Sequence, residues 1–414
     1  MRLKLNSLSL SSLWLALIVV ILCQPSSAES SNFSDWSTLV SLRPPVEIQQ
    51  DVNGRGIAPK NWFFHRIEDS AGDDNGPTNL DYYSVTIKKL PIIQGNSVSA
   101  NDFLMFVRLN LGSKFLDTSV ASFSPYFDAA NTSETAKWNS TNPLGAIAHF
   151  AIHLIGAVIP VVVNPSLLDD NAAVAVAEYA PDHWIFSTLW TTADFGHPVS
   201  GNREFGIRPQ PDGSFIFYTR GADRPTSQVD LNAQRASGVV FNGANKLWIS
   251  LQQKVADFVN TNGGQAEIGP VVFSVSGQKW GDVKQKYYRP TTPWLSLGGT
   301  WKGTWPFDDQ TGFVNPQTLE MTLTDTFNPT PLTEIDGSRT HTYTGQMTIR
   351  DDTTGSVGSP LTVNNISLGP KGAISFKPGF NTTFKGTLSS DYSDMSGGVT
   401  FIIQPRGKFH LVKQ

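Results

Sequence analysis

The sequence predicts an α+β domain followed by a small all-β antiparallel barrel, and three features of its 414 residues support this prediction. The middle of the chain has an order of strands and helices that ends in one long amphipathic helix. Near Trp294 the pattern changes to short alternating runs that are broken by Gly, Pro, Asn and Asp. The N-terminus begins with a short apolar segment that is typical of a cleaved leader.

The N-terminal segment has the pattern of a secretory signal peptide. Two basic residues precede an apolar run, 13–22, and small residues ending at Ala28 follow it. The run is short for a membrane-spanning helix, so we expect residues 1–28 to be removed and the protein to be secreted or extracytoplasmic. The single cysteine, Cys23, would leave with this segment; a lipid anchor there fits less well because Leu22 is bulky. Packing without disulfides would then stabilise the mature chain.

The charge balance excludes one class of partner. The chain has 31 Lys and Arg against 35 Asp and Glu, a net charge of −4, and no segment clusters the basic residues. Contacts with phosphates need such clusters, so we expect no nucleic-acid partner. Sequons of the form N-x-S/T permit glycosylation without requiring it.

The first regular elements are a strand and a helix. Residues 81–91 (DYYSVTIKKLP) are rich in β-branched and aromatic residues and end at a proline, which predicts a strand. Ser99 and Asp102 form a capping-box pattern at the start of a helix. The residues that share one face of this helix are Phe103, Phe106, Val107 and Leu111.

The apolar run 144–163 is the one internal stretch with the composition of a membrane helix. Phe150 and Ile152 alternate in it with His149 and His153, and a proline interrupts its second half. Alternation of this kind predicts a strand, so we expect no stable membrane span.

Further strands and a closing helix follow. Residues 172–190 contain two strand-like runs, and 202–221 predict a hairpin that turns at Pro211-Asp212-Gly213. Residues 241–264 predict a long helix that Asn242 caps and two glycines end. Its apolar stripe is Ala244, Leu247, Trp248, Leu251, Val255, Phe258 and Val259.

The C-terminal part has a different pattern. Eight short alternating runs lie between 299 and 413, with almost no helical signal, and predict a small antiparallel barrel or sandwich. We therefore expect an α+β domain over 29–275, a linker with a short helix over 276–293, and the barrel over 294–414.

The N-terminal domain resembles a known fold. The order strand, helix, antiparallel strands and closing helix over about 79–264 is similar to the helix-grip fold of START-type lipid-binding and polyketide-cyclase-like proteins. The runs GHPVSGNREFGI, GSFIFYTRGADRP and LQQKVADFV resemble a bacterial branch of that superfamily. The resemblance implies an apolar cavity between the sheet and the closing helix, which suits a hydrophobic small molecule or lipid. It brings no catalytic motif.

The C-terminal part resembles the lipocalin or calycin barrels at three short motifs. These are Gly299-Thr300-Trp301, then Ser390-Asp391-Tyr392, then Arg406, in the family's order. The resemblance implies that Trp301 and Arg406 close one end of the barrel.

Several polar and aromatic side chains are candidates to line the cavity. HFAIH lacks the Glu of a zinc-binding H-E-x-x-H, so its two histidines are better read as a polar lining. Ser200 lacks the flanking glycines of a nucleophile elbow, so we interpret 191–207 as a polar corner whose His197 faces the cavity. The candidate ligand-binding residues are His149, His153, Trp184, Phe186, Trp190, His197, Arg203, Tyr218, Arg220 and Leu251. We expect no catalytic residue, metal site or cofactor.

Three functions fit these observations. The first is a secreted protein that binds a hydrophobic small molecule or lipid in the helix-grip cavity, with the barrel as an accessory. The second is an exported cyclase, isomerase or hydrolase that acts in the same cavity. The third is a surface interaction protein with no small-molecule ligand.

Overall fold

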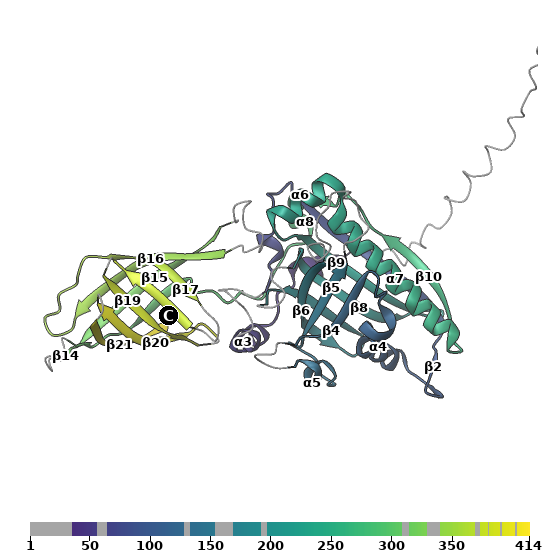
Figure 1. The fold of residues 1–414 in the computed structure, drawn as a ribbon, viewed down its shortest axis with the longest axis horizontal. Helices are drawn as coiled ribbons and strands as arrows, with labels where there is room; N and C mark the ends of the chain where they lie inside the picture. Colours follow the sequence, from purple (N-terminus) through teal and green to yellow (C-terminus); the bar gives the residue numbers. More distant parts are fainter. Residues whose placement is uncertain are drawn as a thin grey trace, which may run out of the picture. The chain divides into compact units, whose positions relative to one another are not determined.

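The protein is mostly β-structure with few helices. The computed structural model describes residues 35–55, 64–127, 133–153, 169–191, 197–308, 314–328, 340–368, 373–379, 381–389, 391–401 and 404–414. These residues form a large sheet with its helices and a closed barrel (Figure 1). The expected signal peptide, 1–28, lies outside them. No helix in the described ranges combines the length and the apolarity that a bilayer crossing needs.

The large sheet is antiparallel and has nine strands within the described residues. Eight of them follow one another across the sheet, and β11 (Gln278–Lys279) pairs beside β1. The order is β10 (Gln265–Val272), β1 (Pro77–Lys89), β9 (Phe215–Pro225), β8 (Val199–Pro209), β7 (His183–Leu189), β6 (Asp169–Ala180), β5 (Ile147–His153) and β4 (Ala121–Pro125). The strands predicted from 81–91, 172–190 and 202–221 are confirmed, and β8 and β9 form the predicted hairpin.

Short helices accompany the sheet, and a two-stranded ribbon of β2 (Ile92–Ile93) and β3 (Asn96–Ser97) leads into one of them, α4. The capping box of α4 is formed as predicted, with the Asp102 backbone N–H donating to Ser99 Oγ over 3.1 Å. The sequence pattern did not reveal α2 or α3. The helices are α2 (Ser37–Ser41), α3 (Val46–Gly54), η1 (Ile67–Asp69), α4 (Ala100–Leu109), η2 (Leu111–Phe115), α5 (Thr135–Trp138), α6 (Gln228–Ser237), α7 (Val239–Thr261) and α8 (Trp280–Tyr287).

The closing helix α7 begins earlier than its sequence suggested. It starts at Val239, directly after Gly238, which takes a left-handed conformation (φ 69°) between α6 and α7. Asn242 therefore lies inside the first turn, and the prediction that it caps the helix is wrong. The helix α6 was not predicted because its residues are mostly polar, although Ser227 and Asp230 form a capping box at its start.

The main core lies between one face of the sheet and the helices α4 and α7. Figure 1 shows α7 running obliquely across the strands. Alternate residues of each strand face it, and the apolar stripe of the helix packs against them. The largest members of this core are Tyr83, Phe103, Phe115, Trp138, Phe150, Trp184, Phe186, Phe205, Phe217 and Trp248.

The second face of the sheet is also covered. The helix α2 packs against β8 and β9, and a smaller apolar cluster with Val52, Phe64 and Leu189 lies on this side. Arg220 is buried here beside Glu204, 2.7 Å from its carboxylate, and lies over the ring of Trp36. The sequence listed Arg220 as a candidate to line the cavity, but the structure buries it on this second face, where α2 covers β8 and β9.

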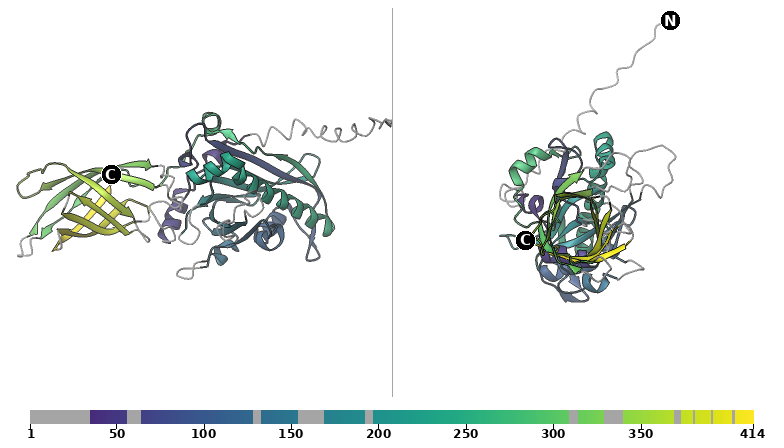
Figure 2. Two further views of the ribbon diagram at one scale, coloured as in Figure 1. Left: turned by 45° about the horizontal axis from the view of Figure 1, so that its top comes forward. Right: turned by 90° about the vertical axis from the view of Figure 1, so that its left-hand side faces the viewer.

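The C-terminal region is a closed eight-stranded antiparallel barrel, and all eight predicted runs lie in its strands. In the right-hand view of Figure 2 these strands surround a common centre. A small ribbon of β13 (Phe307–Asp308) and β14 (Val314–Asn315) was not predicted. The barrel strands are β12 (Gly299–Thr304), β15 (Gln317–Asn328), β16 (Thr340–Asp351), β17 (Leu361–Leu368), β18 (Ala373–Pro378), β19 (Thr382–Leu388), β20 (Asp394–Phe401) and β21 (Gln404–Lys413).

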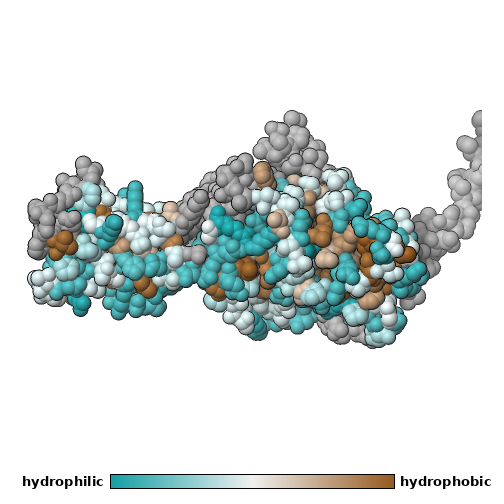
Figure 3. Space-filling view, turned by 90° about the horizontal axis from the view of Figure 1, so that it is seen from below, coloured by the Kyte–Doolittle hydropathy of each residue, from teal (hydrophilic) through white to brown (hydrophobic). Residues whose placement is uncertain are grey.

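The barrel interior is apolar, and the outer surface seen in Figure 3 is mostly hydrophilic. Trp301 is fully buried and donates from Nε1 to the Leu297 carbonyl over 2.9 Å. The cation near its ring is Lys413, at 5.8 Å, whereas Arg406 lies over the ring of Phe307. The expectation that Trp301 and Arg406 close one end of the barrel stays a prediction. Ser390 lies outside the described residues.

The segment expected to be a linker has a regular structure. It contains β11 and α8, and residues after α8 bond to α3 and to the segment between α2 and α3. Arg43 donates to the Tyr288 hydroxyl over 2.7 Å, and the side chain of Gln49 donates to the Pro293 carbonyl over 2.9 Å. The boundary at 276–293 stays a prediction.

Candidate ligand pocket

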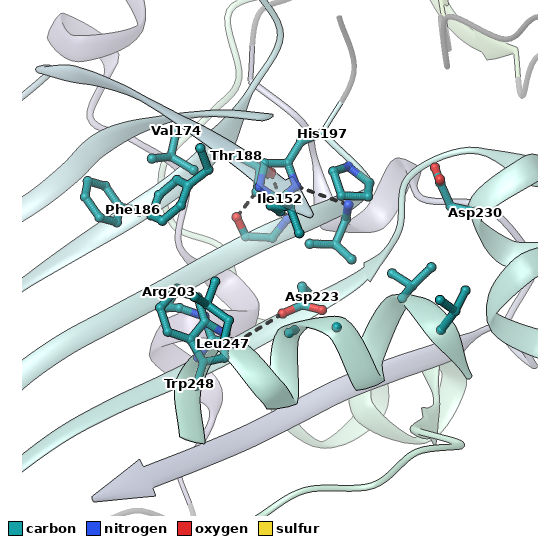
Figure 4. Close-up of a pocket in the computed structure, with 18 of the residues that line it drawn as sticks. Ile152, Val174, Phe186, Thr188, His197, Arg203, Asp223, Asp230, Leu247 and Trp248 are labelled. Atoms are coloured by element: carbon teal, nitrogen blue, oxygen red, sulfur yellow. Dashed lines mark hydrogen bonds and ion pairs between the residues drawn. The ribbon is translucent and has the colours of Figure 1, made fainter. Parts of the chain in front are cut away.

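A pocket of about 300 Å³ lies between the sheet and the helices α6 and α7. This volume is at the lower end of the range found for small-molecule sites. The strands β5 to β9 form its floor, and the first turns of α7 form its cover (Figure 4). Most of the lining is apolar and comprises Phe150, Ile152, Val174, Phe186, Val199, Val229, Ala233, Val239, Val240, Ala244, Leu247 and Trp248.

The apolar lining follows from two periodicities. Phe150, Val174 and Phe186 occupy alternate positions on neighbouring strands, so they project from the same face of the sheet. Ala244 and Leu247 are three residues apart on α7, so they share the face that looks down on that sheet. The side chains of a strand face and of the helix packed on it normally fill the space between the two elements. Here small residues of α6 and α7 leave part of it open.

A buried ionic network lies at the polar end of the pocket. Arg203 Nη2 donates to both carboxylate oxygens of Asp81, over 2.7 and 2.8 Å, and lies 3.7 Å from Asp223 Oδ2. The side-chain amide of Asn79 donates to Asp81 over 2.8 Å. The guanidinium of Arg203 also stacks on the indole of Trp248, 4.4 Å from the ring centroid. The network therefore holds one guanidinium between two carboxyl groups.

A glycine allows this network to form across three strands. Asp81 on β1 and Arg203 on β8 are both register partners of Gly221 on the strand between them, β9. A Cβ atom at Gly221 would lie 2.2 Å from Arg203 Nη2 and 3.0 Å from Asp81 Oδ1. The missing side chain therefore leaves the space in which the two charged groups meet.

Asp223 has an unusual environment for a carboxyl group. Its side chain is 8% exposed, and its Oδ1 has no hydrogen-bond partner among the described residues. Burial and the nearby Asp81 raise its pKa from 3.8 to about 7, although Arg203 opposes this change. The pocket thus contains a carboxyl oxygen that has been removed from water without a replacement partner.

His197 contributes a second polar group to the lining. Its Nδ1 accepts from the Val199 backbone N–H over 3.1 Å, which places the proton of the neutral ring on Nε2. Burial lowers the pKa of His197 from 6.5 to about 3, and the charge of Arg203 acts in the same direction. His197 is therefore a neutral hydrogen-bond donor, and no described residue accepts from its Nε2.

The two shifted groups predict opposing effects of pH on stability. The raised pKa of Asp223 makes the folded state bind more protons than the unfolded state between about pH 4 and 7, so its contribution falls as pH rises. The lowered pKa of His197 makes its contribution rise between about pH 3 and 6.5. In Asp223→Asn only the second effect remains. Its free energy of unfolding should climb with pH more steeply than that of the parent, by up to about 1.4 kcal/mol per pH unit.

Urea unfolding at several pH values between about 4.5 and 6.5 measures this slope. Asp212→Asn is the matched control, because Asp212 lies in the exposed turn of the same hairpin and its lowered pKa titrates below this window. If the free energy of unfolding changes with pH equally in Asp223→Asn and the parent, the raised pKa of Asp223 is contradicted.

Only some of the candidate residues from the sequence line the pocket. Phe186, His197 and Arg203 line the pocket, whereas Leu251 is fully buried one turn further along α7. The other candidates are not among the lining residues. Trp184 stacks on Phe205, and Trp190 stacks on His65. Tyr218 and Arg220 bond to Glu204 on the opposite face of the sheet. His149 is the register partner of Ala173 between β5 and β6. The side chain of His153 lies outside the described residues.

Sequence reasoning missed Asp81 and Asp223. Both lie in strands that were predicted, but neither was a candidate, and their partner Arg203 is over a hundred residues from Asp81. One signal was present: Asp81 and Asp223 lie on the same strand faces as the aromatic residues Tyr83 and Phe217, at positions where a charge needs a partner.

The described residues offer little for nucleophilic or metal chemistry. Ser200 Oγ bonds to Thr226 Oγ1 over 2.8 Å, and the one hydroxyl in the lining, Thr188 Oγ1, bonds to the backbone of Gly201. Within the described part of the chain, no three His, Cys, Asp or Glu side chains lie close enough to hold a metal ion. From Val199 onward the predicted polar corner is strand β8.

No protein-family model and no curated protein matches the sequence. The assignment of function therefore depends on the pocket itself.

Proposed function

We propose that the chain binds a small hydrophobic molecule, such as a lipid fragment or another apolar metabolite, in the pocket covered by α7, in a helix-grip-like arrangement. The observation that carries the proposal is the mainly apolar lining of a cavity of about 300 Å³ within an otherwise packed core. Export of the mature chain through the N-terminal leader, with the barrel as an accessory domain, belongs to the same proposal.

An enzyme acting in the same pocket is the second candidate, and one observation favours it. A buried carboxyl group whose pKa is raised to about 7, as at Asp223, is the kind of group that acts as a general acid or base. Binding explains the same lining without requiring a reaction, so it is the preferred function.

Filling the pocket tests the proposal. Ala244 lines the pocket from α7, so Ala244→Trp should place an indole in the open space and abolish binding of the neutral fluorescent probe N-phenyl-1-naphthylamine. The melting temperature should change little, because the added side chain occupies space that is empty. Fluorescence titration and thermal unfolding measure the two effects.

Leu251→Trp is the matched control on the same helix. Leu251 is fully buried and does not line the pocket, so this change should overpack the core and cost about 1–3 kcal/mol or more. The proposal fails if the parent protein does not bind the probe, or if Ala244→Trp binds it as well as the parent does.

A further inference from the structure

The polar atoms at the Asp223 end of the pocket restrict the ligand further. Asp223 Oδ1 is buried and accepts no hydrogen bond from the described residues. Figure 4 shows the two oxygens of this carboxylate pointing in different directions, one of them toward Arg203. A buried carboxyl oxygen without a donor loses its hydration without compensation, so a ligand that brings a donor would restore the missing bond.

Two hydrogen-bond donors belong to residues of the same lining. The indole Nε1 of Trp248 is buried and bonds to no described residue, and His197 carries its proton on Nε2. Both residues line the pocket. The lining residues therefore carry an unused acceptor on Asp223 and unused donors on Trp248 and His197. A hydroxyl group can donate one hydrogen bond and accept others, whereas an ether only accepts and an ammonium only donates.

The charges around the pocket disfavour an anionic ligand. Asp223 and Asp230 line it and Asp81 lies next to it, while Arg203 is the one cation within the lining that the structure describes. The guanidinium is already bonded to both oxygens of Asp81, and Arg220 and Arg224 bond to Glu204 and to backbone carbonyls. A carboxylate ligand would add a negative charge without a buried cation to receive it.

We infer that the ligand is an apolar molecule that ends in a hydroxyl group, which donates to Asp223 Oδ1. This inference rests on the proposed function, because it specifies the chemistry of the molecule that the same pocket binds. The apolar body would lie against Phe186, Val174 and Leu247, and the hydroxyl group would lie at the Asp223 end of the pocket.

Four probes with the same alkyl chain test the inference on the unaltered protein. Decanol, decyl methyl ether, decylamine and decanoate are titrated against bound N-phenyl-1-naphthylamine at about pH 8, where Asp223 is mainly ionised. Decanol should displace the probe at a concentration at least about tenfold lower than the ether, because a hydrogen bond to a charged group is gained. Decanoate should be the weakest competitor.

A variant assigns the preference to one side chain. Asp223→Leu removes the acceptor and should bring decanol to the level of the ether, while the ether itself still binds. Asp257→Leu is the matched control, because Asp257 is exposed on α7 and its carboxylate accepts from Gln253. The Asp257→Leu variant should keep the preference for decanol over the ether.

The outcomes separate this inference from the proposed function. Failure of N-phenyl-1-naphthylamine to bind the parent overturns both. Binding of the probe with equal displacement by decanol and the ether, or strongest displacement by decanoate, overturns the hydroxyl inference alone. If decylamine displaces the probe most strongly, the pocket prefers an amine to a hydroxyl group, and the inference is overturned.

Discussion

Replacing Arg203 with methionine is expected to lower the free energy of unfolding by about 3–5 kcal/mol at about pH 8. The guanidinium is the charged partner of two buried carboxyl groups, Asp81 and Asp223, whose side chains are 0% and 8% exposed. Without it, both carboxylates would be buried without a compensating charge. The stacking of Arg203 on Trp248 would be lost as well.

The loss should shrink as pH falls. Arg203 opposes the rise in the pKa of Asp223, so removing the cation raises that pKa further; the folded protein then binds more protons than the unfolded chain and gains stability at lower pH. Urea unfolding of Arg203→Met and the parent at about pH 8 and about pH 5 measures the difference.

Arg208→Met is the control on the same strand. Arg208 is 36% exposed in its side chain and lies 3.7 Å from Glu204, so its loss should cost about 1 kcal/mol or less. Equal losses for the two variants, or a loss for Arg203→Met that does not depend on pH, would contradict the network as described.

Leu251→Ala is expected to lower the free energy of unfolding by about 2–5 kcal/mol. Leu251 is 0% exposed and belongs to the core between α7 and the sheet, so the substitution removes buried apolar contacts and leaves a cavity. Chemical denaturation of the variant and the parent measures the change.

Ile249→Ala on the same helix provides the comparison. Ile249 is 44% exposed, so its truncation should change stability by about 0.5 kcal/mol or less. A similar cost at both positions would mean that the helix is not packed on the sheet through the face containing Leu251.

The sequence predicted those parts of the fold in which apolar residues repeat at a regular local spacing. The stripe from Leu247 to Val259 has helical spacing, and the eight barrel strands alternate between inward and outward residues. The helix α6 was missed because its exposed face is polar and only a few of its residues, Leu231 among them, are buried.

The pocket was less predictable because it depends on register between distant strands. The meeting of Asp81 with Arg203 requires β1, β9 and β8 to be neighbours and Gly221 to lie between the two side chains. No local pattern contains this information. The sequence likewise identified α7 as the cover of a cavity but chose Leu251, one turn beyond Leu247 and Trp248, which line it.

The most direct test of the central claim is to identify what the pocket retains. The purified protein and its Ala244→Trp variant are incubated with a mixed lipid extract and isolated again, and the bound molecules are identified by mass spectrometry. We predict that the parent retains about one small apolar molecule per chain, enriched in alcohols, and that the filled variant retains none. Retention of the same molecules in the same amounts by both proteins would contradict the claim that this pocket is the binding site.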